Sequence, residues 1–124
     1  MAKKILIIED EKLITKTLQK LLKKEGYEVE IANNGADAIE RAKEKDFDLI
    51  VSDIRMPLMD GIETIKVIRE NRQEAGKPLI PEIIITGYAD EEKYKSAVDL
   101  KVAAYIYKPF DTEEFLEAIR NNIK

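Results

Sequence analysis

The chain has 124 residues, a length that suits one compact domain, so we expect a single domain over residues 1–124. It contains no cysteine and no histidine, which excludes disulfides, thiolate catalysis, cysteine-based zinc sites and a histidine general base. The net charge of −4 disfavours nucleic acid as a direct partner. The sequence shows neither a signal-peptide pattern nor the roughly 20 apolar residues of a membrane span, so we expect a cytoplasmic protein without membrane contact.

Five short segments predict β-strands, at residues 4–8, 27–32, 49–53, 82–86 and 103–107. Residues 5–8 and 49–51 are unbroken apolar runs, which is the pattern of strands buried on both faces of a parallel sheet. The second segment alternates between apolar and acidic side chains, which indicates a half-exposed edge strand. Pro57 cannot continue a strand, so the third strand must end just after Asp53.

Helical periodicity follows each predicted strand. The first helix runs to about residue 24, where Gly26 suits a C-terminal cap, and leucines form its apolar face (Leu13, Leu18, Leu21 and Leu22). Further helices are expected at 36–45, after Asp60, at about 89–100 and after Asp111, with the two aspartates as N-caps. Residues 71–81 contain Gly76, Pro78 and Pro81 and are predicted to be an irregular surface connection.

This β-α alternation, repeated five times, predicts an α/β fold. Strands that alternate with single helices form right-handed crossovers and a parallel sheet that is covered on both faces, a doubly wound architecture. All the carboxyl ends of such strands lie on one edge of the sheet, where ligands bind.

Potentially reactive side chains stand at the ends of four predicted strands. They are Glu9 and Asp10 after the first strand, Asp53 on the third, Thr86 on the fourth and Lys108 after the fifth. We therefore expect these five side chains to converge, with Asp53 at the centre.

Three acids in one place repel each other unless a cation joins them. Because the donors are all oxygen atoms, the expected ion is Mg²⁺, with Mn²⁺ as an alternative. Lys108 adds a positive charge suited to an anion and Thr86 adds a hydroxyl donor. Together these groups are typical of phosphoryl transfer, with Asp53 as a carboxylate nucleophile.

The chain resembles the receiver domain of two-component response regulators along essentially its whole length. The resemblance rests on four motifs in order: IIEDE at 7–11, SDIRMPLMDG at 52–61, ITG at 85–87 and YIYKPF at 105–110. It implies a flavodoxin-like fold with five parallel strands in the order 2-1-3-4-5 and five helices.

The resemblance also implies roles for single residues. Asp53 is expected to accept a phosphoryl group from a histidine on a sensor kinase or a histidine phosphotransfer protein. Mg²⁺ is expected to bind Asp10, Asp53 and the backbone carbonyl of Arg55, with Glu9 acting through water. Lys108 is expected to contact the phosphoryl group, and the bond before Pro109 to be cis.

Two further residues are implied as parts of a switch. Thr86 is expected to turn its hydroxyl toward the phosphoryl oxygen, and Tyr105 to move inward, so that the face of the fourth helix, fifth strand and fifth helix changes its affinity for an output partner. Tyr88 stands two residues after Thr86, where its bulk predicts slow self-hydrolysis of the phosphoryl group. Lys101, Val102 and Ala104 depart from the usual family pattern near the fifth strand.

Other functions are alternatives. A receiver fold that binds partners without phosphorylation usually lacks one acid or the lysine, whereas all of these residues are present here. An aspartyl-phosphate phosphatase needs a second acid two residues after its nucleophile, where Arg55 stands. A nucleotide- or flavin-binding protein needs a glycine-rich loop after the first strand, where this chain has acids.

Overall fold

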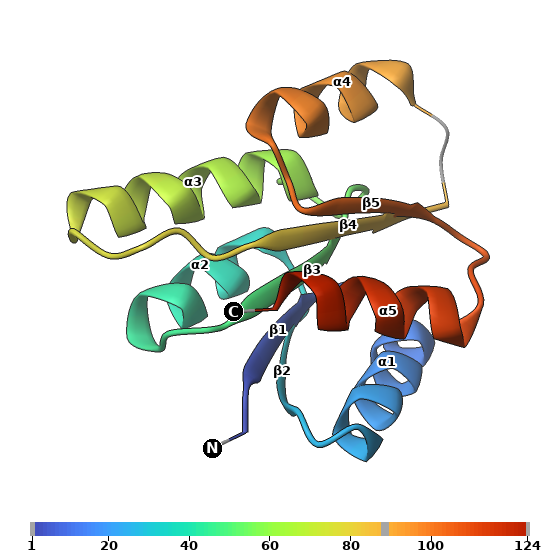
Figure 1. Cartoon of the computed structure of the whole chain (residues 1–124). Coiled ribbons are helices and arrows are strands. Elements are labelled where there is room, and N and C mark those ends of the chain that lie inside the picture. Colours follow the sequence, from blue (N-terminus) through green and yellow to red (C-terminus); the bar gives the residue numbers. More distant parts are fainter. Residues whose placement is uncertain (1, 88–89, 124) are drawn as a thin grey trace.

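The computed structural model describes residues 2–87 and 90–123. Five strands form one sheet: β1 (Lys4–Ile8), β2 (Glu28–Ala32), β3 (Leu49–Asp53), β4 (Glu82–Thr86) and β5 (Ala104–Tyr107). Helices alternate with them: α1 (Lys12–Lys24), α2 (Gly35–Glu44), α3 (Gly61–Glu74), α4 (Glu91–Leu100) and α5 (Thr112–Asn122). All strand pairs are parallel, as the sequence pattern predicts, and the order is β2-β1-β3-β4-β5, as the family resemblance implies (Figure 1).

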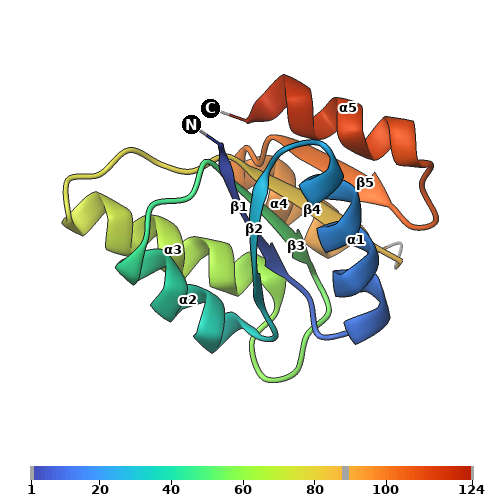
Figure 2. The ribbon, with the colours of Figure 1, turned by 90° about the horizontal axis from the view of Figure 1, so that it is seen from below.

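Helices cover both faces of the sheet. Figure 2 shows α1 and α5 on one side and α2 and α3 on the other. The alternation of side chains along β1 explains how one strand serves both layers: Ile5 and Ile7 pack with α1 and α5, whereas Leu6 and Ile8 pack with α2 and α3. The expected doubly wound fold is therefore confirmed.

Local capping sets several element boundaries as predicted. Asp60 caps α3 in a complete capping box with Glu63, and the Asp111 carboxylate accepts the Glu114 N–H at the start of α5. Gly26 follows α1 with φ +92°, a left-handed conformation that suits glycine.

Some predicted details are wrong. Leu13 is 78% exposed and does not join the apolar face of α1, which buries Leu18 and Leu22. The helix α3 continues to Glu74, into the segment that was expected to be irregular. Buried Arg72 supports this last turn, since its guanidinium donates to the Pro78 carbonyl at 2.6 Å and to Asp46 at 3.1 Å.

The edges of other elements shift by one or two residues. The second strand begins at Glu28 and the fifth at Ala104, α2 begins at Gly35 behind the N-cap Asn34, and α4 begins at Glu91 behind the N-cap Asp90. Within residues 2–87 and 90–123, no helix has the length and apolar character that a membrane crossing requires.

Candidate functional site

The predicted site residues lie along the carboxyl-end edge of the sheet. Glu9 and Asp10 directly follow β1, Asp53 and Thr86 end β3 and β4, and Lys108 directly follows β5. The backbone ties the last two strands together here, because the Lys108 N–H donates to the Thr86 carbonyl at 2.8 Å. The bond between Lys108 and Pro109 is cis, as predicted.

Lys108 joins two of the acids. Its Nζ lies 3.0 Å from Oδ2 of Asp53 and 3.4 Å from Oε2 of Glu9. Glu9 is fully buried and the Asp53 side chain is 8% exposed. One cation therefore serves two buried carboxylates, and the cluster retains an excess of negative charge.

The backbone around Asp53 fixes this carboxylate. The Ile54 N–H donates to its Oδ1 at 2.7 Å, and the Ser52 hydroxyl donates to its backbone carbonyl at 2.8 Å. Gly61 packs so closely that a Cβ there would lie 2.1 Å from the Asp53 carbonyl oxygen. One backbone donor thus holds the Asp53 carboxylate, while Ser52 and Gly61 fix the backbone that carries it.

Electrostatics in the cluster follow from burial and like charge. Burial and the neighbouring Asp53 charge raise the pKa of Glu9 to about 7, although Lys108 opposes the shift. Burial disfavours the charged form of Lys108, but its hydrogen bond to Asp53 and the charge of Glu9 outweigh that effect and raise its pKa. The lysine therefore stays charged, and a further cation beside the two acids would lower their repulsion.

The expected metal-binding cluster of three acids is only partly assembled. Glu9 and Asp53 come together through Lys108, whereas Asp10 is exposed beside them. Across the described ranges 2–87 and 90–123, no group of three acidic side chains is close enough to enclose a metal ion. The chemistry of the donors still fits Mg²⁺, because the nearby ligands are carboxylate and carbonyl oxygens with excess negative charge.

Thr86, an expected switch residue, and Arg55, whose backbone carbonyl is an expected Mg²⁺ ligand, line the same cavity of about 330 Å³. Thr86 is fully buried, while Arg55 is exposed in the loop after β3. Tyr88 lies outside the described residues.

Tyr105 packs its ring edge-on against Tyr94 and Tyr107, with ring centroids 5.1 and 5.3 Å apart. Its hydroxyl is the one buried side-chain polar atom without a hydrogen-bond partner in the part of the chain that the structure describes. Burial of the ring raises the pKa of this phenol to about 12.

Sequence reasoning missed Lys93. Its ammonium forms an ion pair with the carboxylate of Asp60, which was expected only to cap a helix. Nothing in the spacing of these two residues predicts the pair, since they are 33 positions apart on different helices.

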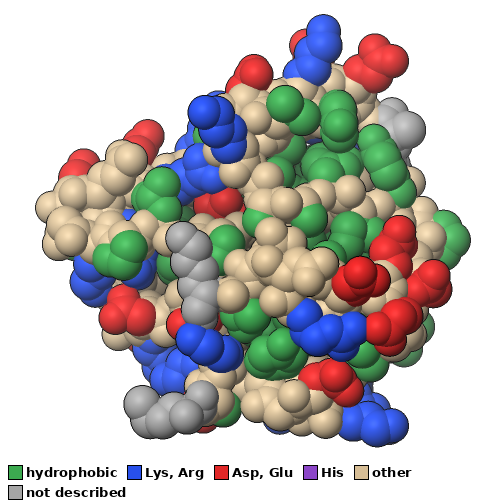
Figure 3. Space-filling view, in the orientation of Figure 1, with side chains coloured by type: hydrophobic (Ala, Val, Ile, Leu, Met, Phe, Trp, Pro, Cys, Tyr) green, Lys and Arg blue, Asp and Glu red, His purple; other side chains and the backbone are tan. Residues whose placement is uncertain are grey.

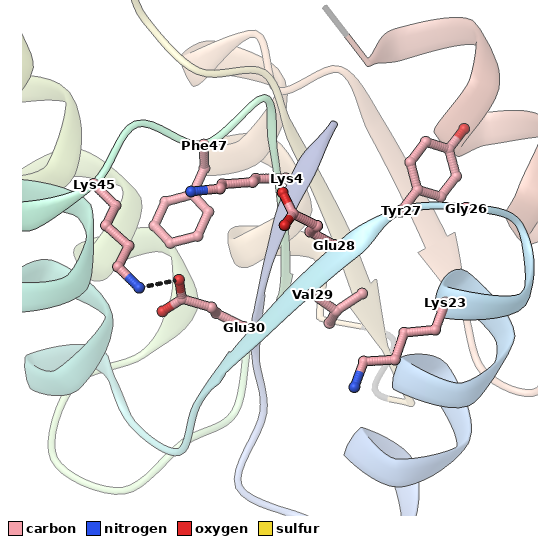
Figure 4. Close-up of a pocket in the computed structure, with 9 residues that line it drawn as sticks. All are labelled: Lys4, Lys23, Gly26, Tyr27, Glu28, Val29, Glu30, Lys45 and Phe47. Carbon is pink, nitrogen blue, oxygen red and sulfur yellow. Dashed lines mark hydrogen bonds and ion pairs between the residues drawn. The ribbon is translucent and has the colours of Figure 1, made fainter. Parts of the chain in front are cut away.

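A second hollow lies at the opposite end of the sheet. It measures about 510 Å³ and is lined by residues around the edge strand β2. Figure 4 shows Lys45 reaching Glu30 there, with 2.6 Å between Nζ and the carboxylate. None of the predicted site residues lines this hollow, so it is separate from the Asp53 cluster.

Comparison with known proteins places this geometry in a family. The family model of the response regulator receiver domain matches residues 5–120. The chain belongs to this family. The chemotaxis protein CheY of Halobacterium salinarum is 38% identical over 119 residues, which cover 96% of this chain and 95% of that protein.

Solved receiver structures share the fold. A CheY-like receiver domain from Methanospirillum hungatei is 31% identical with a TM-score of 0.89, over 98% of this chain and 93% of that one. The chemotaxis protein CheY4 of Vibrio cholerae is 28% identical with a TM-score of 0.88, over 99% and 100% of the two chains.

Other relatives are longer than this receiver domain. The probable transcriptional regulator ycf29 of Pyropia yezoensis is 35% identical over 99% of this chain, but the chain spans only 54% of that protein. It spans 24% of the transcriptional regulatory protein ZraR of Klebsiella oxytoca.

Proposed function

We propose that this receiver domain accepts a phosphoryl group on Asp53 from a phosphohistidine donor. The observation that carries the proposal is the placement of Asp53 at the carboxyl end of the central strand, where its carboxylate accepts from the Ile54 N–H and pairs with Lys108. A carboxylate oxygen of Asp53 forms the new bond to phosphorus, and the bond between phosphorus and the donor histidine breaks.

The surrounding residues assist this transfer. Lys108 already lies 3.0 Å from Asp53, so its ammonium can stabilise the charge on the transferred group. Asp10, Asp53 and the Arg55 carbonyl would hold Mg²⁺, with Glu9 acting through water. The bound ion supplies charge neutralisation for the incoming phosphoryl oxygens.

Receiver domains act with histidine kinases or phosphotransfer proteins, and we infer such a donor here. For output, we propose the face formed by α4, β5 and α5. Hydrophobic side chains gather over α4 and β5 in Figure 3, and Tyr94, Val98 and Tyr107 are 44–54% exposed. Thr86 and Tyr105 would couple the phosphoryl group to this face.

The test is incubation with a small acyl phosphate in the presence of Mg²⁺, Mn²⁺ or a chelator, followed by intact mass measurement. We expect a metal-dependent gain of one phosphoryl group that is absent in Asp53→Asn and retained in Asp99→Asn, an exposed acid of α4. An unmodified but folded wild-type protein would instead favour a receiver-fold module that binds partners without phosphorylation.

A further inference from the structure

Helix α4 buries little of its surface against the rest of the domain. Ala97 is its one fully buried residue in the described part of the chain, and it packs with Ile62, Ile65 and Ile84. Polar contacts at the two ends of the helix therefore contribute much of its attachment to the domain.

The contact at the carboxyl end is rigid. Arg69 of α3 donates from Nη1 to the Leu100 carbonyl at 2.5 Å and binds the carboxylate of Glu82 with two hydrogen bonds of 2.8 and 2.7 Å. The Glu82 side chain is only 3% exposed. A guanidinium held by two bonds to a buried carboxylate has little freedom to move.

At the amino end, the described residues form an ion pair, beside the ring contact of Tyr94 with Tyr105. Lys93, in the first turn of α4, reaches Asp60, and its side chain is 37% exposed. Asp60 itself is held firmly, because it caps α3 and the next residue, Gly61, donates to the Ile54 carbonyl at 2.8 Å and lies against the Asp53 backbone. The ion pair therefore ties the first turn of α4 to the segment that carries Asp53.

Open space adjoins this ion pair. Lys93 and Asp60 line the cavity of about 330 Å³ together with Thr86 and Asp90, the N-cap of α4. Because this cavity borders both Thr86 and the first turn of α4, a movement of that turn toward Thr86 would alter the geometry of the Lys93 contact.

We propose that Lys93 is a positioning residue that, through Asp60, holds the amino end of α4 in its unphosphorylated arrangement. The helix pivots on the Arg69 contact when the ion pair opens. The inference rests on the proposed phosphorylation of Asp53 and adds a control to it: the ion pair sets how readily the domain reaches its phosphorylated state.

The direction of the effect follows from linkage. A contact that is stronger in the resting arrangement opposes any ligand that prefers the other arrangement. Removing the ion pair should therefore tighten the binding of a phosphoryl analogue. Partly exposed ion pairs have a modest strength, which corresponds to an affinity change of about two- to fivefold.

The test compares Lys93→Gln, Asp60→Asn, the double variant and Lys93→Arg in the full chain. Asparagine is as good an N-cap as aspartate, so Asp60→Asn removes the charge and keeps the cap of α3. Lys95→Gln, at an exposed lysine of the same helix, is the matched control. Calorimetry measures the affinity for beryllofluoride with Mg²⁺, and hydrogen exchange measures the opening of α4 without ligand.

Support would be a two- to fivefold tighter Kd in both single variants, no further gain in the double variant, and wild-type behaviour in Lys93→Arg and Lys95→Gln. Exchange should rise in the first turn of α4 and stay unchanged near Leu100. If the wild type binds the analogue and both single variants bind it with the same or lower affinity, this inference alone is overturned. A wild type that binds no analogue overturns the proposed function, and this inference falls with it.

Discussion

Single residues at the strand ends determine the chemistry of the site. Lys108 contacts two buried acids, and the backbone near Asp53 leaves no room for a larger residue at position 61. The position of Asp53 thus depends on a glycine as well as on charged partners.

Gly61→Ala is predicted to destabilise the domain by about 1–3 kcal/mol, the usual result of overpacking, and to slow phosphorylation of Asp53. The reason is that the new Cβ would lie 2.1 Å from the Asp53 carbonyl oxygen and 2.9 Å from the Ser52 hydroxyl. Urea unfolding and the acyl phosphate assay measure the two effects. Gly87→Ala is the control, since a Cβ at position 87 meets nothing within 4 Å; equal losses in both variants would refute the explanation.

Thr86→Val is predicted to keep the phosphorylation of Asp53 and to lose the response of the α4 and β5 face, because valine retains the shape of the buried side chain without its hydroxyl. Thr86→Ser should retain both. Hydrogen exchange of α4, with and without the donor, separates the variants. A full response in Thr86→Val would remove the hydroxyl from the proposed mechanism.

At the scale of elements, polar side chains join helices that have little apolar contact. Arg69 connects α3, β4 and α4, whereas Lys93 connects α4 to the N-cap of α3. The burial of each ion pair decides how much it contributes to the free energy of unfolding.

Arg69→Met is predicted to lower the free energy of unfolding by about 3–5 kcal/mol, because it leaves the buried Glu82 carboxylate without its partner. Adding Glu82→Leu should recover most of this loss, since the pair is then replaced by apolar groups. Arg41→Met is the comparison: its pairs with Glu30 and Asp37 are more exposed, and the loss should stay below about 1 kcal/mol. Urea denaturation measures the free energy of unfolding of the wild type and of the three variants. Equal losses in Arg69→Met and Arg41→Met would contradict the argument.

The ion pair between Asp60 and Lys93 predicts a pH dependence. Burial raises the pKa of Asp60, but hydrogen bonds from Lys93 and the Glu63 backbone outweigh burial, so this pKa lies below its ordinary 3.8. The hydrogen bond to Asp60 raises the pKa of Lys93 above 10.5, and the charges of Glu63 and Asp90 add to the shift.

The contribution of the pair should therefore be constant between about pH 4 and pH 10. It should decline as the pH falls through the lowered pKa of Asp60, and also as it rises through the raised pKa of Lys93. The measurement is the difference in unfolding free energy between wild type and Asp60→Asn, followed from below pH 4 to above pH 10 and expected at about 0.2–1 kcal/mol on the plateau. If the difference in unfolding free energy stays the same below pH 4, the ion pair is not its cause.

At the scale of the whole molecule, the fold brings the acidic residues Glu9, Asp10 and Asp53 to one edge of the sheet. Mg²⁺ is therefore predicted to stabilise the domain, by about 1.4 kcal/mol at ten times its Kd, because it binds the folded form. Thermal unfolding with and without the ion measures this shift. Asp10→Asn and Asp53→Asn should lose most of it, whereas Asp99→Asn should keep it; equal shifts in all variants would indicate nonspecific screening.

Much of this architecture was predictable from local signals. The apolar run 49–51 and Pro57 located β3, and the motif at 105–110 led to the cis bond before Pro109. Leu13 shows the limit of such signals: periodicity placed it on the apolar face of α1, yet no other element covers it and it is 78% exposed.

By itself, the sequence determined the order of strands and helices and which residues stand at the strand ends, because hydrophobic period, prolines and caps act over a few neighbouring residues. Only the tertiary structure decided that Lys108 serves Glu9 and Asp53 together, that Gly61 meets the Asp53 backbone and that Lys93 reaches Asp60. The contacts of Lys108 and Lys93 join residues that are distant in the chain, and all three depend on how closely the packed elements approach one another.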